Sequence, residues 1–390
     1  MYRETPLRIG HIIQSGSLGV GGPVTAMIAM CSALVRAGCE CSVACHGGDL
    51  RTAPGLDGRI AVSEVGIGRN PLGNGDGMKN LSNFIRNVDV LHLHGLWDPL
   101  PGAAARLARK LRTPYVVSLH GMLLERSMAN HQLRKRLFLA FSGETIMGRA
   151  SALHFTTRLE QRESQPFLPE GLDRVVIPLT IDGGLLERLP GRQEWRRYFP
   201  QLPETWPRLL FLSRIHPVKN LPSLIRALPG LVKEFRGLHL VVAGDGEAEY
   251  VQKMHRIALD AGVSKEILFI GSVTGEEKAA LISSATVMTI PSFHENFGMA
   301  VAEGLACEVP TLVTPGLGIG AEILAHGAGV PCGEDSESIS TAIAGALRKP
   351  EDLRIAGENG RRWAIETLAP GAVAAQLLRL YVKASGGGST

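Results

Sequence analysis

Short apolar runs rich in β-branched residues alternate with amphipathic segments of helical length along the whole chain. In the first half these runs occupy residues 7–14, 41–46, 89–94, 115–120, 152–157 and 174–179. In the second half they occupy residues 208–213, 238–244, 267–271, 286–292 and 311–314. Strands separated by helices of this length imply right-handed crossovers between parallel strands. The pattern therefore predicts two doubly wound α/β domains, each a parallel sheet covered by helices.

The two series of strands are separated by a stretch, residues 179–207, that carries four prolines and no strand pattern. Such a stretch is typical of a linker, here with one short helix. A chain of 390 residues is long enough for two domains of ordinary size. The expected order is a first domain at 1–180, a linker at 181–206, a second domain at 207–369, a final helix at 370–385 and a disordered tail at 386–390.

Composition narrows the class of protein. The chain is 45% hydrophobic and 20% charged, as expected for a well-packed globular protein. No apolar run approaches the roughly 18 residues that a membrane-spanning helix needs. The first residues lack the apolar stretch and cleavage site of a signal peptide. The six cysteines form no disulfide framework, so we expect reduced thiols and a cytoplasmic protein.

The positive charge is concentrated in one region. The net charge is +4, but residues 101–150 hold nine Lys or Arg and two acids, a local excess of seven. Within this region the segment HQLRKRLFLAF, residues 131–141, places three cations beside leucine and phenylalanine. This combination suits an anionic membrane surface, so residues 101–149 are expected to contact the inner face of the plasma membrane. The alternative is a solvated basic helix. No nucleic-acid partner is expected.

The stretch PSFHENFGMAVAEG follows a predicted strand and holds two carboxylates, Glu295 and Glu303, with seven residues between them. Glu295 would lie in a loop and could accept hydrogen bonds from sugar hydroxyls, while Glu303 could accept them from a ribose diol. A helix beginning near Met299 would direct free N–H groups at a phosphate. Gly298 would let a ligand approach the backbone closely. The alternative is two solvated surface charges.

Two cations follow the first strand of the second domain, in LLFLSRIHPVKN. Arg214 and Lys219 would lie at the carboxyl end of that strand, where ligands bind in doubly wound sheets. Together they could neutralise a diphosphate, with Arg as a bidentate donor. The alternative is again a pair of surface charges. The nearby GDG sequence at 244–246 predicts a tight turn.

The first domain begins with a strand that runs into a glycine-rich segment containing Gly19, Gly21 and Gly22. The spacing is not the G-x-G-x-x-G of a dinucleotide site, and no acid ends the second strand, so no nicotinamide cofactor is expected. A Walker A lysine is also absent.

Histidines gather at the ends of predicted strands in the first domain, namely His92, His94 and His120, and Asp98 lies shortly after His94. They come from separate strand ends without a nearby pair of carboxylates, so we expect no metal site. His120 precedes Gly121 at a strand end and could hydrogen-bond a substrate. A purely structural histidine is the alternative.

Taken together, these motifs resemble the retaining GT-B glycosyltransferases of family GT4, the glycosyl transferases group 1. The segment PSFHENFGMAVAEGLACEVPT matches the E-x7-E motif region of that family. VIPLTID, GDGE and the ending GENGRRWAIETLAPGAVAAQLLRLY match as well, so that the likeness covers nearly the whole chain. The chain departs from the family pattern where Asn220 and Glu308 replace the usual glycine, and where GLGIGAEI has an unusual spacing before Glu322.

The resemblance implies a GT-B fold: an N-terminal acceptor domain and a C-terminal nucleotide-sugar domain, both Rossmann-like and facing a cleft, with the helix at 370–385 crossing back to the first domain. It also implies roles for single residues. Arg214 and Lys219 would hold the donor diphosphate, and Gly21 and Gly22 would lie against it from the first domain. Glu295 and the backbone of Asn296, Phe297 and Gly298 would contact the donor sugar. Glu303 would bind the ribose, and His120 would lie by the reacting sugar.

The implied activity is transfer of a hexose from a UDP- or GDP-sugar to a saccharide or polyprenyl-linked saccharide in cell-surface polysaccharide assembly. No metal ion or other cofactor is expected. The alternatives are an inactive nucleotide-sugar-binding protein, a UDP-sugar epimerase of the same fold, and a phosphorylase. The E-x7-E spacing argues against the epimerase. The lack of a lysine suited to pyridoxal phosphate argues against the phosphorylase.

Overall fold

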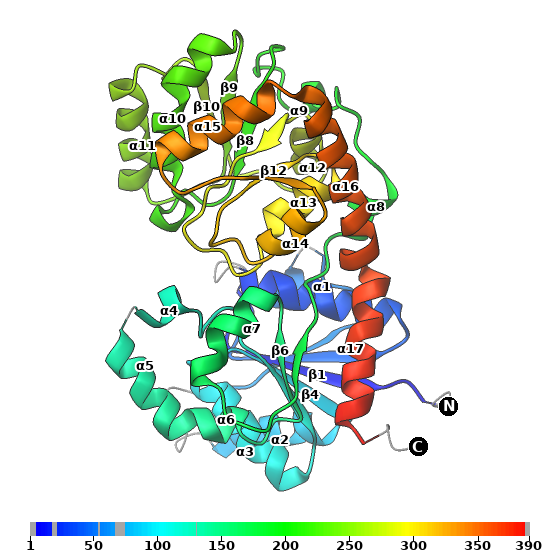
Figure 1. Ribbon diagram of the computed structural model, residues 1–390. Helices are drawn as coiled ribbons and strands as arrows, with labels where there is room; N and C mark the ends of the chain where they lie inside the picture. Colours follow the sequence, from blue (N-terminus) through cyan, green and yellow to red (C-terminus); the bar gives the residue numbers. More distant parts are fainter. Residues whose placement is uncertain (1–4, 18–21, 54, 67–74, 130, 387–390) are drawn as a thin grey trace. The chain divides into compact units, whose positions relative to one another are not determined.

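The computed structural model describes residues 5–17, 22–53, 55–66, 75–129 and 131–386. The chain forms two compact units, and each is a parallel α/β sheet with helices on its faces (Figure 1). The first unit combines residues 1–180 with 370–390, so the C-terminal helix returns to the N-terminal unit, as predicted. The second unit is 181–369. Residues 387–390 of the predicted tail lie outside the described residues.

The sheet of the first unit has seven parallel strands in the order β3-β2-β1-β4-β5-β6-β7. Their bounds are β1 (Arg8–Ile13), β2 (Glu40–Cys45), β3 (Ala61–Glu64), β4 (Val90–His94), β5 (Tyr115–Ser118), β6 (Ala152–Phe155) and β7 (Arg174–Val176). The apolar pattern missed β3, because this four-residue strand lies at the edge of the sheet and buries no residue fully.

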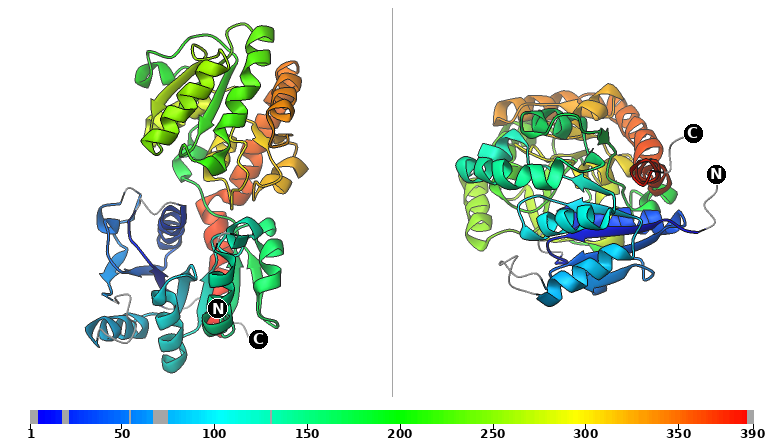
Figure 2. Two further views of the ribbon diagram at one scale, coloured as in Figure 1. Left: turned by 90° about the vertical axis from the view of Figure 1, so that its left-hand side faces the viewer. Right: turned by 90° about the horizontal axis from the view of Figure 1, so that it is seen from below.

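Helices cover both faces of this sheet. One face packs against α1 (Gly22–Arg36) and the C-terminal helix α17 (Pro370–Ala384), which lies alongside the strands in Figures 1 and 2. The other face packs against α2 (Gly75–Arg86), α3 (Pro99–Leu111) and α6 (Glu144–Met147). The remaining elements are η2 (Leu50–Thr52), α4 (Glu125–Ala129), α5 (Gln132–Phe138), η3 (Leu139–Gly143), α7 (Arg158–Ser164) and η4 (Gln165–Phe167).

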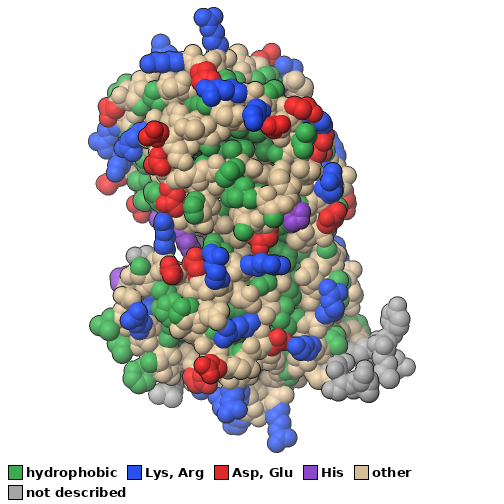
Figure 3. All heavy atoms as spheres, in the orientation of Figure 1, with side chains coloured by type: hydrophobic (Ala, Val, Ile, Leu, Met, Phe, Trp, Pro, Cys, Tyr) green, Lys and Arg blue, Asp and Glu red, His purple; other side chains and the backbone are tan. Residues whose placement is uncertain are grey.

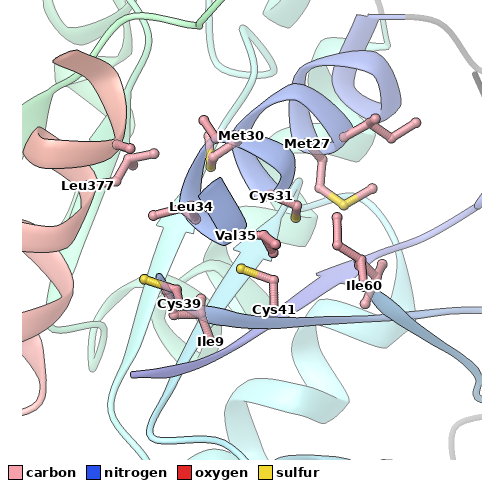
Figure 4. Close-up of a cluster of buried hydrophobic side chains, with 14 of the residues drawn as sticks. Ile9, Met27, Met30, Cys31, Leu34, Val35, Cys39, Cys41, Ile60 and Leu377 are labelled. Atoms are coloured by element: carbon pink, nitrogen blue, oxygen red, sulfur yellow. The ribbon is translucent and has the colours of Figure 1, made fainter. Parts of the chain in front are cut away.

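The core under α1 is built from aliphatic, methionine and cysteine side chains (Figure 4). Cys31 of α1 and Cys41 of β2 are buried in it beside Met27 and Leu34. All six cysteines of the chain are free. Burial raises the pKa of the Cys31 and Cys41 thiols, which therefore stay protonated and pack as small apolar groups.

The sheet of the second unit has six parallel strands in the order β10-β9-β8-β11-β12-β13. Their bounds are β8 (Arg208–Leu212), β9 (His239–Ala243), β10 (Ile267–Gly271), β11 (Val287–Met288), β12 (Thr311–Val313) and β13 (Gly329–Pro331). The short edge strand β13 was not predicted from the apolar pattern. The helices are η5 (Pro217–Lys219), α10 (Leu221–Glu234), α11 (Ala248–Asp260), α12 (Gly275–Ser283), α13 (Met299–Ala306), α14 (Gly320–Ala325), α15 (Ser336–Leu347) and α16 (Pro350–Leu368).

Residues 181–206 are not a free linker, because they belong to the second unit. They form two short helices, α8 (Gly183–Glu187) and α9 (Trp195–Tyr198), where one was expected. Trp195 is buried, and the guanidinium carbon of Arg208 lies 4.0 Å from its ring centroid. The aromatic contact ties the segment to the first strand of the second sheet.

Strand order reverses direction beside β8, which lies between β9 and β11. In doubly wound sheets ligands bind at the carboxyl ends of the strands at such a switch point. The loops after β8 and β11 are therefore where a ligand of the second unit is expected to bind. Among helices in the described ranges, none is long and apolar enough to cross a bilayer.

Candidate functional site

The loop after β8 carries both predicted cations, and it is shaped by a glycine turn from the next strand. Arg214 is exposed and Lys219 is partly buried at the end of η5. The amide of Ile215 donates to the carbonyl of Asp245 over 2.8 Å. A Cβ added to Gly244 would collide with the carbonyl oxygen of Ser213. The turn at 244–246 therefore lies directly against the loop that presents Arg214.

The loop after β11 joins the loop after β8 through an ion pair. The ammonium group of Lys219 donates to Oε2 of Glu295, and the two side chains are 13% and 24% exposed. The amide of Phe293 also donates to the carbonyl of Val218 over 2.9 Å. The structure thus brings together two of the predicted site residues that lie 76 positions apart in the sequence.

Glu303 lies on α13 and pairs with a lysine that the sequence analysis did not single out. Nζ of Lys278 donates to Oε1 of Glu303 over 2.7 Å, with side chains 28% and 13% exposed. Lys278 lies on α12, whose start is set by a capping box between Thr274 and Glu277. The sequence could have drawn attention to Lys278 only through its place on the helix just before β11. The contact with Glu303 itself depends on how α12 and α13 pack.

Helix α13 begins directly after Gly298, which has a φ of 95°. Glycine adopts this left-handed conformation without steric penalty. A Cβ here would lie 2.7 Å from Cδ1 of Leu317. No acid occupies the first turn of α13, so its N-terminal partial positive charge is not offset there. Phe297 is buried, which leaves its backbone as the part that could contact a sugar.

A glycine loop after β12 supports the loop of Glu295, and the sequence analysis assigned it no role. The amide of Glu295 donates to Gly316 O over 2.9 Å, and the amide of Gly318 donates back to Glu295 O over 2.8 Å. A Cβ at Gly318 would collide with the carbonyl oxygen of Asn296. Glycines in this loop are needed for the close approach, which holds Glu295 in place.

The charges of this site nearly balance. Arg214, Lys219 and Lys278 contribute three positive charges, while Glu295 and Glu303 contribute two negative ones, so that one positive charge is left. Both carboxylates already have a lysine partner. Pairs of this kind can exchange partners with a ligand that carries both phosphate and hydroxyl groups, since lysine suits phosphate and carboxylate suits hydroxyl.

In the first unit, Gly22 is the exposed first residue of α1, whereas Gly21 lies outside the described residues. His120 follows β5 with a left-handed φ of 50°. Its Nε2 lies 2.8 Å from Nδ1 of His94. Burial lowers the pKa of His120 to about 3, so the ring is neutral at pH 7.

Several histidines of the first unit are structural neighbours of one another. His11, His92 and His94 each bring a ring nitrogen to within 4.8 Å of the other two, the one metal-like grouping within the described ranges. Nitrogens of His11 and His94 already form a 3.0 Å hydrogen bond. Asp98 instead lies 3.1 Å from His46 and accepts the amide of Leu100 at the start of α3. The trio includes no carboxylate that would offset the charge of a cation.

Two family profiles match the chain in order. The profile of the "Glycosyl transferase 4-like domain" matches residues 21–180, and that of "Glycosyl transferases group 1" matches residues 193–363. The chain belongs to the group 1 glycosyltransferases. It is therefore a glycosyltransferase of the GT4 type, as the motifs predicted.

Curated relatives of this glycosyltransferase act on inositol compounds and lipids, by their names. One is a GDP-mannose-dependent phosphatidylinositol monomannoside mannosyltransferase of Mycolicibacterium smegmatis, 31% identical over 168 residues, which are 41% of this chain and 44% of the relative. Another is a D-inositol 3-phosphate glycosyltransferase of Xylanimonas cellulosilytica, 25% identical over 95% of this chain and 94% of the relative.

Solved structures share the fold of this glycosyltransferase at low identity. HepE of Anabaena in complex with UDP has a TM-score of 0.80 and 17% identity over 96% of this chain and 99% of HepE. Sucrose-phosphate synthase from Thermosynechococcus elongatus has a TM-score of 0.77 and 18% identity, over 98% of this chain and 100% of the synthase. These likenesses establish the GT-B fold.

Asn220 and Glu308, which replace the glycines usual in the family, both occupy left-handed backbone. Asn220 has a φ of 56° and Glu308 a φ of 60°. Asparagine tolerates this conformation, and the Asn220 side chain donates to the carbonyl of Glu334 over 2.7 Å. The Glu308 side chain makes a weaker interaction than that of Asn220, because its carboxylate lies 3.8 Å from the guanidinium of Arg361. Glycine is the usual residue here because of the backbone conformation.

Proposed function

We propose that this glycosyltransferase transfers a hexose from a UDP- or GDP-sugar to a saccharide or lipid-linked saccharide, with retention of the anomeric configuration and without a metal ion. One observation carries the proposal. Arg214 and the two Lys–Glu pairs lie on elements that follow or flank the switch point of the second sheet, together with the start of α13.

The donor would bind in the second unit by partner exchange. Lys219 would leave Glu295 for the diphosphate, beside Arg214 and the first amides of α13. Glu295 would then accept hydrogen bonds from the sugar hydroxyls. Glu303 would bind the ribose diol, and Lys278 would keep that carboxylate ionised and oriented. The UDP bound in HepE and the GDP-mannose in the name of a relative support a nucleotide-sugar donor.

The chemistry would consist of charge stabilisation. Negative charge accumulates on the leaving diphosphate while the anomeric carbon becomes oxocarbenium-like. Arg214, Lys219 and the start of α13 would stabilise that charge in place of a divalent ion. Attack from the face of the departing phosphate would retain configuration, with a phosphate oxygen taking the acceptor proton. A covalent glycosyl adduct on Glu295 would contradict this mechanism.

The acceptor would be presented near a membrane, because α5 and η3 expose apolar side chains among cations. Leu133, Leu137 and Phe141 are 74%, 51% and 82% exposed. Arg134, Lys135 and Arg136 lie in α5 with Leu133 and Leu137. Figure 3 shows hydrophobic and basic side chains next to each other on this side of the first unit. The combination suits anionic headgroups, so we place the protein at the cytoplasmic face of the membrane, in surface polysaccharide assembly.

The first test is a thermal-shift screen of the purified protein against UDP, GDP, ADP and their sugar conjugates. A ligand at about 100 times its Kd adds about 2.7 kcal/mol to the free energy of unfolding. One nucleotide series should shift the melting temperature, and Glu303→Ala should weaken that shift. Glu337→Ala, an exposed glutamate on α15, is the matched control and should leave it unchanged. No shift with any nucleotide would contradict the donor assignment.

Two further measurements separate the finer parts of the proposal. Flotation with anionic liposomes should recover wild-type protein, and a variant with Leu137 and Phe141 changed to Ser should stay at the bottom of the gradient. Transfer in the presence of EDTA, with the anomeric configuration of the product read by NMR, tests retention and metal independence together. Loss of transfer in EDTA would contradict the metal-free mechanism.

A further inference from the structure

One face of the first unit's sheet carries a polar layer beneath α1 and α17, amid apolar neighbours. Strand register pairs His11 with His92. It also places Ser118 between His94 and His154. All five side chains are buried, and their hydrogen bonds form two separate rows. In each row, the group at one end determines which atom of every hydrogen bond is the donor.

The first row ends at a carbonyl group, which can only accept. Nε2 of His154 lies 2.8 Å from Ile177 O and therefore carries a proton, so Nδ1 of His154 is an acceptor. The Ser118 hydroxyl, 2.6 Å away, donates to that nitrogen and accepts from Nε2–H of His92, also at 2.6 Å. The Tyr381 hydroxyl then donates to Nδ1 of His92 over 2.6 Å. Every member of the row is satisfied in its neutral form.

The second row runs from the core to the strand end. Nδ1 of His11 lies 3.0 Å from Nε2 of His94, and Nδ1 of His94 lies 2.8 Å from Nε2 of His120. At the inner end, Nε2 of His11 is buried and has no partner among the described residues. A proton on that atom would be an orphaned buried N–H group, which native proteins avoid more strictly than an unused lone pair. His11 therefore donates from Nδ1, His94 donates in turn, and Nε2 of His120 accepts.

The second row consequently fixes which nitrogen of its outer member, His120, carries the proton. His120 is the partly exposed ring of the three. Since its Nε2 accepts from His94, its proton lies on Nδ1. Burial lowers the pKa values of all three rings, which keeps the row neutral at pH 7. In the neutral row each contact holds one proton, whereas an added proton would either occupy the partnerless Nε2 of His11 as an orphaned N–H or bring two N–H groups together at a contact.

We infer that His94 and His11 are positioning residues that hold His120 neutral with its proton on Nδ1, so that His120 donates a hydrogen bond to an oxygen of the reacting sugar or acceptor. The inference rests on the proposed function for the contact of His120 with substrate. His120 is then a hydrogen-bond donor and not a general base, consistent with a mechanism in which the leaving phosphate takes the proton.

A buried metal ion on His11, His92 and His94 is the competing explanation. It would require one of the two hydrogen bonds of His92 and one of the two hydrogen bonds of His94 to be given up. The cation would also lie in an apolar layer with no anionic ligand in the trio, at a large desolvation cost. The two hydrogen-bonded rows use the same nitrogens without these penalties.

The decisive experiment is a two-bond 1H–15N correlation spectrum of the histidine rings in 15N-labelled full-length protein at pH 7, with assignment by His120→Gln. The expected result is a neutral His120 with its proton on Nδ1, which is the less common tautomer of a free histidine side chain. In His94→Leu this preference should disappear, while His94→Asn, whose amide can donate from the Nδ1 position, should keep it. A proton on Nε2 of His120 in the wild type, or one zinc ion per purified chain, would overturn the inference.

Kinetics supply the second readout. Misplacing a group by about 1 Å can cost about 100-fold, so His94→Leu should lower kcat by about 10- to 100-fold without changing KM for the donor, and His94→Asn should recover most of it. His154→Leu, in the other row, is the matched control and should change kcat less than about threefold. Equal losses in His94→Leu and His154→Leu would overturn the inference. The expected tautomer in a protein without any hexosyl transfer would overturn the proposed function instead.

Discussion

The two units hold their polar groups in opposite ways on similar parallel sheets. In the first unit, histidines and hydroxyls lie on the face of the sheet under α1 and α17, where they are buried and neutral. In the second unit, lysines and glutamates lie beyond the ends of the strands, where they are partly exposed and charged. A sheet face sealed from water favours uncharged groups that satisfy one another, whereas a strand end reached by water permits ion pairs.

The largest expected effect is acid destabilisation of the first unit. Burial lowers the pKa of His11 to about 3 and of His154 to about 4, and those of His92 and His94 fall as well. At pH values between these pKa values and about 6.5, the histidines bind protons in the unfolded chain but not in the folded chain. The free energy of unfolding therefore falls as the pH falls. At pH 5 each such ring lowers the free energy of unfolding by about 2 kcal/mol, and four rings lower it by about 8 kcal/mol. That loss is comparable with the stability of a whole domain.

Hydrogen exchange with mass spectrometry at pH 7.5, 6 and 5, corrected for intrinsic rates, would measure this effect unit by unit. Peptides from β1, β4 and β6 should lose protection first, while those from β8 and β9 should keep it longer. Equal loss in both units would contradict the contrast between a neutral and a charged polar layer.

The next effect concerns activity. Lys219→Ala should lower kcat about 100- to 1,000-fold, because in the proposed mechanism Lys219 stabilises the charge of the leaving diphosphate. The free energy of unfolding should change by less than about 1 kcal/mol, since the pair with Glu295 is partly exposed. Lys233→Ala, an exposed lysine on α10, is the control for charge alone. A large loss of stability with unchanged kcat would show that the pair is structural.

The smallest effect contrasts two left-handed residues. Glu308→Gly should stabilise the protein by about 0.5–1 kcal/mol, because relief of the left-handed conformation outweighs the added entropy of the unfolded chain. Asn220→Gly should destabilise it by about 1 kcal/mol, since the hydrogen bond to Glu334 O is lost. Urea unfolding at neutral pH measures both. Changes of the same sign would contradict this account of the two residues.

The geometry of the candidate site in the second unit was partly predictable from the sequence, and the polar layer of the first unit was not. Arg214, Lys219 and Glu295 lie in the segments that follow strands β8 and β11, so a linear motif was enough to find them. Lys278 pairs with Glu303 across two packed helices, a contact that no local pattern encodes. The short strand β3 escaped because it buries no residue fully.

The polar layer depends on register. His92 and His94 were noticed as strand residues, but His11 and His154 were not linked to them. Their contacts follow from which residue of each strand stands opposite which. A shift by one residue would turn these side chains to the other face, and the sequence does not state the register.

The hydrogen bond between Tyr381 and His92 spans 289 positions. During synthesis the ribosome releases the sheet of the first unit long before it makes α17. While the entire second unit is translated, the part of the apolar face that α17 will cover therefore stays exposed, and Nδ1 of His92 lacks its Tyr381 partner. Chaperone binding to this face, and ready proteolysis of chains that stop before residue 370, follow from that order of events.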